Sequence, residues 1–166
     1  MPKVHVTAFI EESARVIGDV EVEEDSSVWF NCVIRGDVLP IRVGRRTNIQ
    51  DGSILHPSNQ MMVRVGDNVT VGHGAVIHGC TVQSNCLIGM RATIMDKVVI
   101  GEWSIVGAGA LVTEGTDIPS RSVALGIPAK VVRSVDEEDL KLLRTRHLEY
   151  VELKDAYLRE RSRNRL

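Results

Sequence analysis

The chain has 166 residues, enough for one domain with a sizeable core, and its formal net charge of −2 gives no argument for a nucleic-acid partner. Its three cysteines are widely spaced and odd in number, which favours a reducing compartment over a disulfide framework. The start lacks the pattern of a signal peptide, and no apolar run approaches the length of a membrane span. We therefore expect a soluble cytoplasmic protein without a membrane partner.

Branched aliphatic residues recur at every sixth position through most of the chain, with three shifts of register. The series reads Val4, Ile10, Val16, Val22, Val28, Ile34, Val43, Ile49, Leu55, Val65, Val71, Ile77, Val82, Ile88, Ile94, Ile100, Val106, Val112 and Ile118. Slots four residues later hold small residues, among them Ala14, Cys32, Thr81 and Cys86. This pattern is the hexapeptide repeat of a parallel β-helix, in which three repeats form one coil of about 18 residues. A narrow triangular interior leaves no room for aromatic rings, which form only 4% of the chain.

The coils end near Ile118, and the pattern becomes helical from Ser134. The tetrapeptide "SVDE", which starts at Ser134, reads as a capping box. The expected buried face of the helix follows steps of three and four residues: Leu140, Leu143, His147, Tyr150, Leu153 and Tyr157. We thus predict a mainly β protein with two parts. Residues 1–133 form the β-helix with the functional site, and residues 134–166 form a helix on that β-helix or on a neighbouring subunit.

Two histidines share one register position on neighbouring coils. His56 follows inward-pointing Leu55, and His78 follows inward-pointing Ile77. Outward imidazoles stacked about 4.8 Å apart can bind one metal ion. His73 lies one repeat before His78 and hence on another side of the triangle. A three-fold trimer would bring a neighbour's His73 to this pair, so we expect a homotrimer with a metal site at each interface.

The same register places other side chains around the histidines: Arg35 beneath His56, Asp51 beneath His73 with Gln50 beside it, and Met90 and Met95 above His73 and His78. Arg35 and Asp37 could instead form only an inter-subunit ion pair, and Gln50 and Asp51 could be only a polar turn. We expect Cys80 to lie off the ligand column.

Three segments carry a family resemblance: "VIRGDV" from Val33, "TNIQDGSILH" from Thr47 and "TVGHGAVIHGC" from Thr70. In these segments and in its repeats, the sequence resembles the gamma-class carbonic anhydrases, a family of left-handed β-helices. The resemblance implies zinc bound by His56 and His78 with the neighbour's His73. Around that site it implies roles for Arg35, Asp37, Asn48, Gln50 and Asp51, and it matches Tyr150 more weakly.

The implied reaction is reversible hydration of carbon dioxide to bicarbonate. Three neutral imidazoles leave a zinc ion one position for water, whose pKa falls to about 7. Iron, cobalt and nickel suit the same ligands. The family's most studied type has a glutamate where this chain has Val38, and a longer acidic loop. That loop carries a glutamate that shuttles the proton from metal-bound water. In this chain His147, or Asp51 through a water molecule, is the candidate proton carrier in its place. The alternatives are a hexapeptide acyltransferase, a metal-dependent acyl-CoA thioesterase and a non-catalytic zinc-stabilised scaffold.

Overall fold

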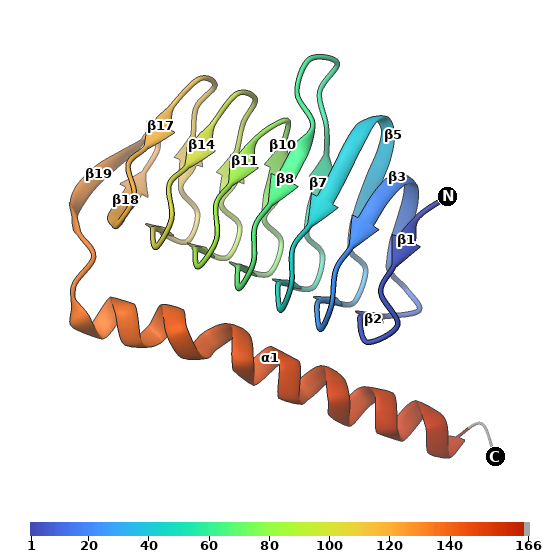
Figure 1. Ribbon diagram of the computed structural model, residues 1–166. Coiled ribbons are helices and arrows are strands. Elements are labelled where there is room, and N and C mark those ends of the chain that lie inside the picture. Colours follow the sequence, from blue (N-terminus) through green and yellow to red (C-terminus); the bar gives the residue numbers. More distant parts are fainter. Residues whose placement is uncertain (165–166) are drawn as a thin grey trace.

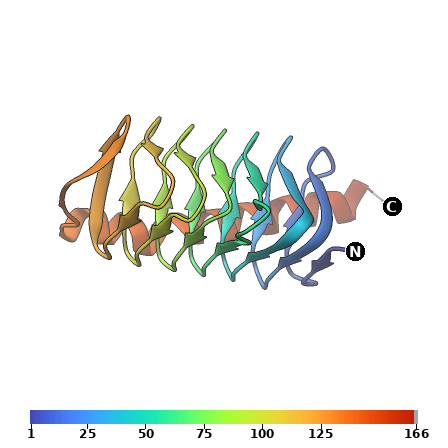
Figure 2. The same ribbon diagram turned by 90° about the horizontal axis from the view of Figure 1, so that it is seen from above.

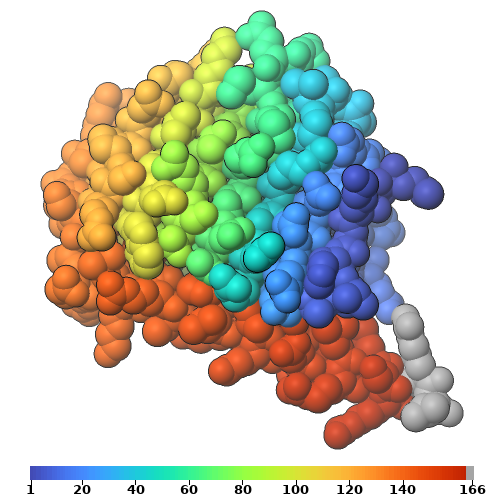
Figure 3. Space-filling model, viewed as in Figure 1, coloured from blue at the N-terminus to red at the C-terminus, as the bar shows by residue number. Residues whose placement is uncertain are grey.

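A computed structural model describes residues 1–164, which form a solenoid of short parallel strands and one long C-terminal helix (Figure 1). The solenoid is a left-handed β-helix of triangular cross-section, as the repeat and the resemblance predicted. The coils follow one another as successive bands of colour along its axis (Figure 3). Among the described residues, no helix is both long and apolar enough to cross a membrane.

Three columns of strands form the faces of the solenoid. The first, which we call the histidine face, contains the first half of β3 (Arg15–Val22), the first half of β5 (Val33–Val43), β7 (Ile54–His56), β10 (Val76–His78), β13 (Thr93–Ile94) and β16 (Leu111–Val112). The second, the open face, contains β1 (Lys3–Val4), the second halves of β3 and β5, β8 (Val63–Val65), β11 (Thr81–Val82), β14 (Val99–Ile100) and β17 (Asp117–Ile118). Because β3 and β5 continue around the corner, the hydrogen bonds join these two faces into one sheet.

The third column, the helix face, forms a separate sheet. It contains β2 (Phe9–Ile10), β4 (Ser27–Val28), β6 (Asn48–Ile49), β9 (Thr70–Val71), β12 (Leu87–Ile88), β15 (Ile105–Val106) and β18 (Ser122–Gly126). The last strand, β19 (Ala129–Ser134), pairs antiparallel with β18 and ends the solenoid. Helix α1 (Glu137–Asn164) then runs back along this face for the length of the solenoid (Figure 2).

The six-residue series forms the core. From Val22 to Ile118 every member is buried, whereas Val4 is exposed and Ile10 and Val16 are half-buried, because the first coil has no coil before it. The small slots from Ala14 to Ser104 are buried except at one register shift, where Cys80 is fully buried and Thr81 only half-buried; Ala8 and Thr116, near the two ends of the solenoid, are also half-buried. Cys80 therefore belongs to the core, and burial raises the pKa of its thiol to about 12.

Aromatic side chains fill the space between α1 and the helix face. The Tyr157 ring lies 5.7 Å from that of Phe9 and 5.2 Å from that of Trp29, and the Tyr150 ring lies 5.6 Å from Trp29. These edge-on contacts place the few aromatic residues outside the coils, as the narrow interior requires. They also fix the rotation of α1 about its axis.

The predicted buried side of α1 was wrong at one position. Leu153 is 43% exposed, whereas Lys154 is only 2% exposed. The steps of three and four residues reach Lys154 after Tyr150, and the solenoid provides a partner for its charge. The Lys154 Nζ lies 3.1 Å from Asp25 Oδ1 and 2.6 Å from Asp155 Oδ1.

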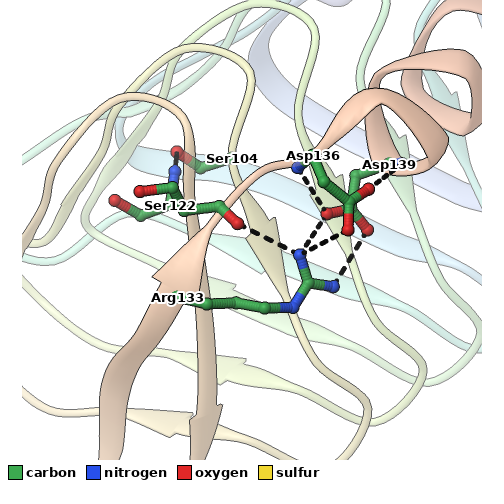
Figure 4. Close-up of polar contacts among 6 residues, drawn as sticks. Ser104, Ser122, Arg133, Asp136 and Asp139 are labelled. Carbon is green, nitrogen blue, oxygen red and sulfur yellow. Dashed lines mark hydrogen bonds and ion pairs between the residues drawn. The ribbon is translucent and has the colours of Figure 1, made fainter.

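The predicted capping box was also wrong by two residues. Ser134 stays in β19, where it pairs with Ser122, and the helix begins at Glu137. Asp136 caps it, because the Asp139 backbone N–H donates to Asp136 Oδ1 at 2.9 Å and the Asp136 N–H donates to Asp139 Oδ2 at 3.0 Å. The Arg133 guanidinium binds both carboxylates (Figure 4).

We expect Asp136→Ala to lower the free energy of unfolding by about 0.5–2 kcal/mol, the usual cost of losing an N-cap. Ser134→Ala is the matched control and should change it little, since the Ser134 side chain is exposed and does not cap the helix. Urea denaturation of the two variants measures the difference. A larger loss in Ser134→Ala would contradict the assignment of the cap.

Candidate metal centre

His56 and His78 stand side by side on the histidine face, at the ends of β7 and β10. The two residues are register partners in the parallel ladder, as the sequence predicted. His56 Nδ1 lies 3.2 Å from His78 Nε2, and the ring centroids are 5.3 Å apart. The hydrogen-bonded ladder of β7 and β10 therefore fixes the positions of both histidines, and their side chains converge on one point.

Each of these imidazoles has a carboxylate at its other nitrogen. His56 Nε2 lies 3.2 Å from Asp37 Oδ1, and His78 Nδ1 is in close contact with Asp96 Oδ1. An ionised carboxylate only accepts hydrogen bonds, so in a neutral imidazole the nitrogen that faces it carries the proton. The two nitrogens that face each other then both present lone pairs.

This donor arrangement suits a metal ion. Two lone pairs 3.2 Å apart repel each other unless a cation lies between them. Nitrogens bound at 2.0–2.1 Å to a tetrahedral zinc ion are about 3.3 Å apart, close to the spacing here. The chemistry and the spacing of this pair therefore fit two ligands of one metal ion.

His73 lies elsewhere, in the turn between β9 and β10 at the corner of the helix face and the histidine face. Its Nδ1 lies 2.9 Å from Asp51 Oδ2, which leaves Nε2 as the lone-pair nitrogen. The register places Asp51 beneath His73 as predicted, since the Gly74 N–H donates to the Asp51 carbonyl at 2.8 Å. Within residues 1–164 of one chain, no group of three or more His, Cys, Asp or Glu side chains is arranged to hold a metal.

Asn48, Gln50 and Tyr150 lie on the same side of the molecule as His73. Gln50 Nε2 donates to Asn48 Oδ1 at 3.0 Å, and Asn48 Nδ2 donates to Thr70 Oγ1 at 3.0 Å. This chain of amides fixes Gln50 with its Oε1 available as an acceptor. Burial raises the pKa of the Tyr150 hydroxyl, and the charge of Asp51 adds to that effect.

Arg35 and Asp37 lie with His56 and form an ion pair with each other inside one chain. Hydrogen bonds from Arg35 and then from His56 hold the pKa of the Asp37 carboxyl below its usual range. Asp37 thus stays ionised and accepts a hydrogen bond from His56 Nε2. The structure divides the predicted residues into two groups: Arg35, Asp37, His56 and His78 on one side, and Asn48, Gln50, Asp51, His73 and Tyr150 on the other.

Asp96 is the residue that sequence reasoning missed. We expected Met95 above His78, and Met95 is 41% exposed; the next residue turns back, and its carboxylate contacts His78. Its position two residues after Ile94, the register partner of Ile77, was the available signal. A side chain at Gly79 would meet Asp96 Oδ1 at 3.0 Å and Ser58 Oγ at 2.9 Å.

An open depression of about 470 Å³ adjoins the histidine pair. Its lining residues are His56, Pro57, Ser58, Asn59, Gln60, His78, Asp96, Lys97 and Glu114. The loop between β7 and β8, which projects above its neighbours in Figure 1, forms one wall. Acidic groups therefore do reach the depression, but they come from the following coils rather than from this loop.

His147, a proposed proton carrier, is not among the residues that line this depression. It is 7% exposed on the buried side of α1, and its Nδ1 lies 3.2 Å from the Leu143 carbonyl one turn earlier in the same helix. Burial lowers the pKa of its imidazole, and the charge of Arg46 lowers it further. Its position is that of a packing residue between α1 and the solenoid.

Comparisons with known proteins agree with this fold. The "Bacterial transferase hexapeptide (six repeats)" model matches residues 79–114. A Bacillus cereus structure proposed to be an acetyltransferase superposes with a TM-score of 0.93 at 45% identity, covering 94% of this chain and 91% of that one. The chain is thus a hexapeptide-repeat protein with a left-handed β-helix.

Relatives identify the family within that class. A carbonic anhydrase of Geobacillus kaustophilus is 45% identical over 94% of this chain and 86% of its own length. Gamma carbonic anhydrase 2, mitochondrial, of Arabidopsis thaliana is 42% identical over 98% of this chain. The chain belongs to the gamma-class carbonic anhydrase-like family, although it spans only 61% of the length of that Arabidopsis relative.

Replacing His56 or His78 by alanine should abolish tight zinc binding and leave the solenoid folded. Both side chains point away from the core, so no core volume is lost. Equilibrium dialysis with metal analysis measures the binding, and circular dichroism measures the fold. His5→Ala, which changes an exposed histidine of the first coil, is the control. One tightly bound metal per subunit in either variant would show that the replaced histidine is not a ligand.

Proposed function

We propose that this chain is the subunit of a homotrimeric zinc enzyme that interconverts carbon dioxide and bicarbonate. The observation that carries the proposal is the pair of lone-pair nitrogens of His56 and His78, 3.2 Å apart on the outer surface of the solenoid. The names of the relatives give the reaction, which the geometry of the pair alone does not specify.

The division of the ligands supports a trimer. His56 and His78 converge, while His73 belongs to another corner of the same chain. A neighbouring subunit would place its own His73, with Asp51, opposite this pair. Ile17 and Ile54, which are 46% and 42% exposed on the histidine face, would gain burial in the same contact. One interface would thus complete the ligand set and cover apolar surface.

The ligand set fits zinc, with iron, cobalt and nickel as chemical alternatives. A bound zinc ion would act as a Lewis acid, lowering the pKa of water to about 7. The chain's own residues would orient the reactants. Asp51 holds His73, and Asp37, fixed by Arg35, holds His56.

The amide chain would place the reacting water. Gln50 cannot rotate freely, because its nitrogen donates to Asn48, so its oxygen would accept a hydrogen bond from that water in a fixed direction. Asn48 is 1% exposed and acts through Gln50. Tyr150, half-buried beside Asp51 and with a raised pKa, would remain a neutral hydrogen-bond donor at neutral pH.

Stopped-flow measurement of carbon dioxide hydration by the zinc-loaded protein tests the proposal, with acyl-CoA turnover measured on the same sample. The Bacillus cereus structure proposed to be an acetyltransferase favours acyl transfer as the second candidate. Hydration that is lost in His78→Ala supports the proposal. Acyl-CoA turnover alone would support an acyltransferase or a thioesterase, and neither activity in zinc-loaded trimers would support a scaffold.

We expect sedimentation to give three times the chain mass of 18.3 kDa. His73→Ala should lose tight zinc binding as completely as His78→Ala, although His73 lies apart from the other two histidines within one chain. Both results follow because the site would be complete only at an interface. A monomer with full metal content would contradict the shared site.

Hydration should be slow and limited by proton release to the buffer, because Val38 stands where a carrier would and is 47% exposed. A positioned acid or base contributes about 10²–10⁴-fold. Turnover should therefore rise with imidazole buffer concentration at fixed pH and ionic strength, and Val38→Glu should recover part of that gain. Fast turnover that is indifferent to buffer would reveal an internal carrier, for which Glu114 is the first residue to replace.

A further inference from the structure

We propose that Asp96 is a positioning residue that holds His78 in the tautomer needed for metal binding. This inference rests on the proposed metal site and adds a residue to it. Asp96 follows β13, one coil beyond His78, and its Oδ1 contacts His78 Nδ1. The carboxylate is 27% exposed, so water competes only partly for this contact.

The contact determines which nitrogen of His78 is free. The acceptor at Nδ1 keeps the proton there, so the lone pair lies on Nε2. That nitrogen faces His56 Nδ1 at 3.2 Å, and Asp37 imposes the corresponding choice on His56. With both carboxylates in place, neither histidine can donate to the other. The pair is thereby kept from a hydrogen bond that metal binding would have to break.

Removing Asp96 would release this constraint. His78 could then move its proton to Nε2 and donate to His56 Nδ1, because 3.2 Å is within hydrogen-bonding range. His78 Nε2 would then carry a proton instead of a lone pair, and the lone pair of His56 Nδ1 would accept the hydrogen bond from it. Metal binding would then require a tautomer change and the loss of a hydrogen bond. Partners of this kind usually contribute 10–100-fold in metal affinity.

The backbone next to His78 and the turn that carries Asp96 are held close together. Gly79, next to His78, has φ +49°, which disfavours a side chain there, and a Cβ would lie 3.0 Å from Asp96 Oδ1 and 2.9 Å from Ser58 Oγ, so these side chains would have to shift. The backbone also fixes the turn that carries Asp96, since the Lys97 N–H donates to the Gly79 carbonyl at 2.8 Å. Asp96 thus completes a set in which each of the three histidines has its own aspartate: His56 with Asp37, His73 with Asp51 and His78 with Asp96.

The first test uses protein without metal. Nitrogen-15 NMR of ring-labelled histidines at pH 8 reports which nitrogen carries the proton, and His78→Gln assigns the His78 signals. In the unchanged chain we expect His78 with the proton on Nδ1. In Asp96→Ala we expect a shift toward the form with the proton on Nε2. An unchanged tautomer in Asp96→Ala would overturn the inference.

The second test is zinc affinity, measured at pH 8 by competition with a chelator. Asp96→Ala should bind zinc 10–100-fold more weakly than the unchanged chain. Asp96→Asn keeps an acceptor oxygen without the charge, so its loss should be smaller; it also serves if the alanine variant does not fold. Glu114→Gln removes a carboxylate that lines the same depression but pairs with Lys97 at 2.9 Å, and its affinity should be unchanged.

The outcomes separate this inference from the proposed function. If the unchanged chain binds no zinc, the proposed function fails, while the NMR comparison still decides the role of Asp96. If zinc binds and Asp96→Ala matches the unchanged affinity, the inference is wrong and the metal site stands. Equal losses in Asp96→Ala and Glu114→Gln would assign the effect to local charge and would also overturn the positioning role.

Discussion

The parallel pairing of each coil with the next is the constraint on which the structure depends. It stacks Leu55 on Ile77 inside the solenoid and His56 on His78 outside it with the same hydrogen bonds. Successive residues of a strand point to opposite faces, so a slip of one residue would bury a histidine and expose an aliphatic side chain. The burial of the core and the register of the histidine pair are therefore one property of the fold.

The ladder sets where the imidazoles stand, and the carboxylates set which nitrogens they present. Asp37 lies on an earlier coil than His56, and Asp96 on a later coil than His78, so the pair is bracketed along the axis. Two carboxylates beside two imidazoles favour a cation between the rings. On the proposed site, the carboxylates act through the direction of their hydrogen bonds as well as through charge. Asp96 and Glu114 line the same depression, but Asp96 contacts His78 whereas Glu114 pairs with Lys97, so we expect different effects from them.

The regular part of the fold could be predicted from the sequence, because one inward residue in six must be apolar and branched whatever the turns do. The register of His56 and His78 followed from the same rule. The repeat gives the position of Asp96, two residues after Ile94, but not its contact with His78, since Asp96 lies in a corner turn whose direction the repeat does not specify. Cys80 and Thr81 exchanged roles at a register shift for the same reason. Lys154 was missed because its burial depends on Asp25, a partner remote in the chain.

The convex shape of a solenoid explains why a site of this kind would be shared. The interior is filled by branched side chains, so ligands have to stand on the outside, and side chains at different corners of a convex prism diverge. His56 and His78 can converge because they stack along the axis, but His73 at another corner cannot join them. On the proposed site, the third histidine would come from a neighbouring subunit. On the proposed site, a metal ion bound by two subunits favours their association, and association raises metal affinity by the same free energy.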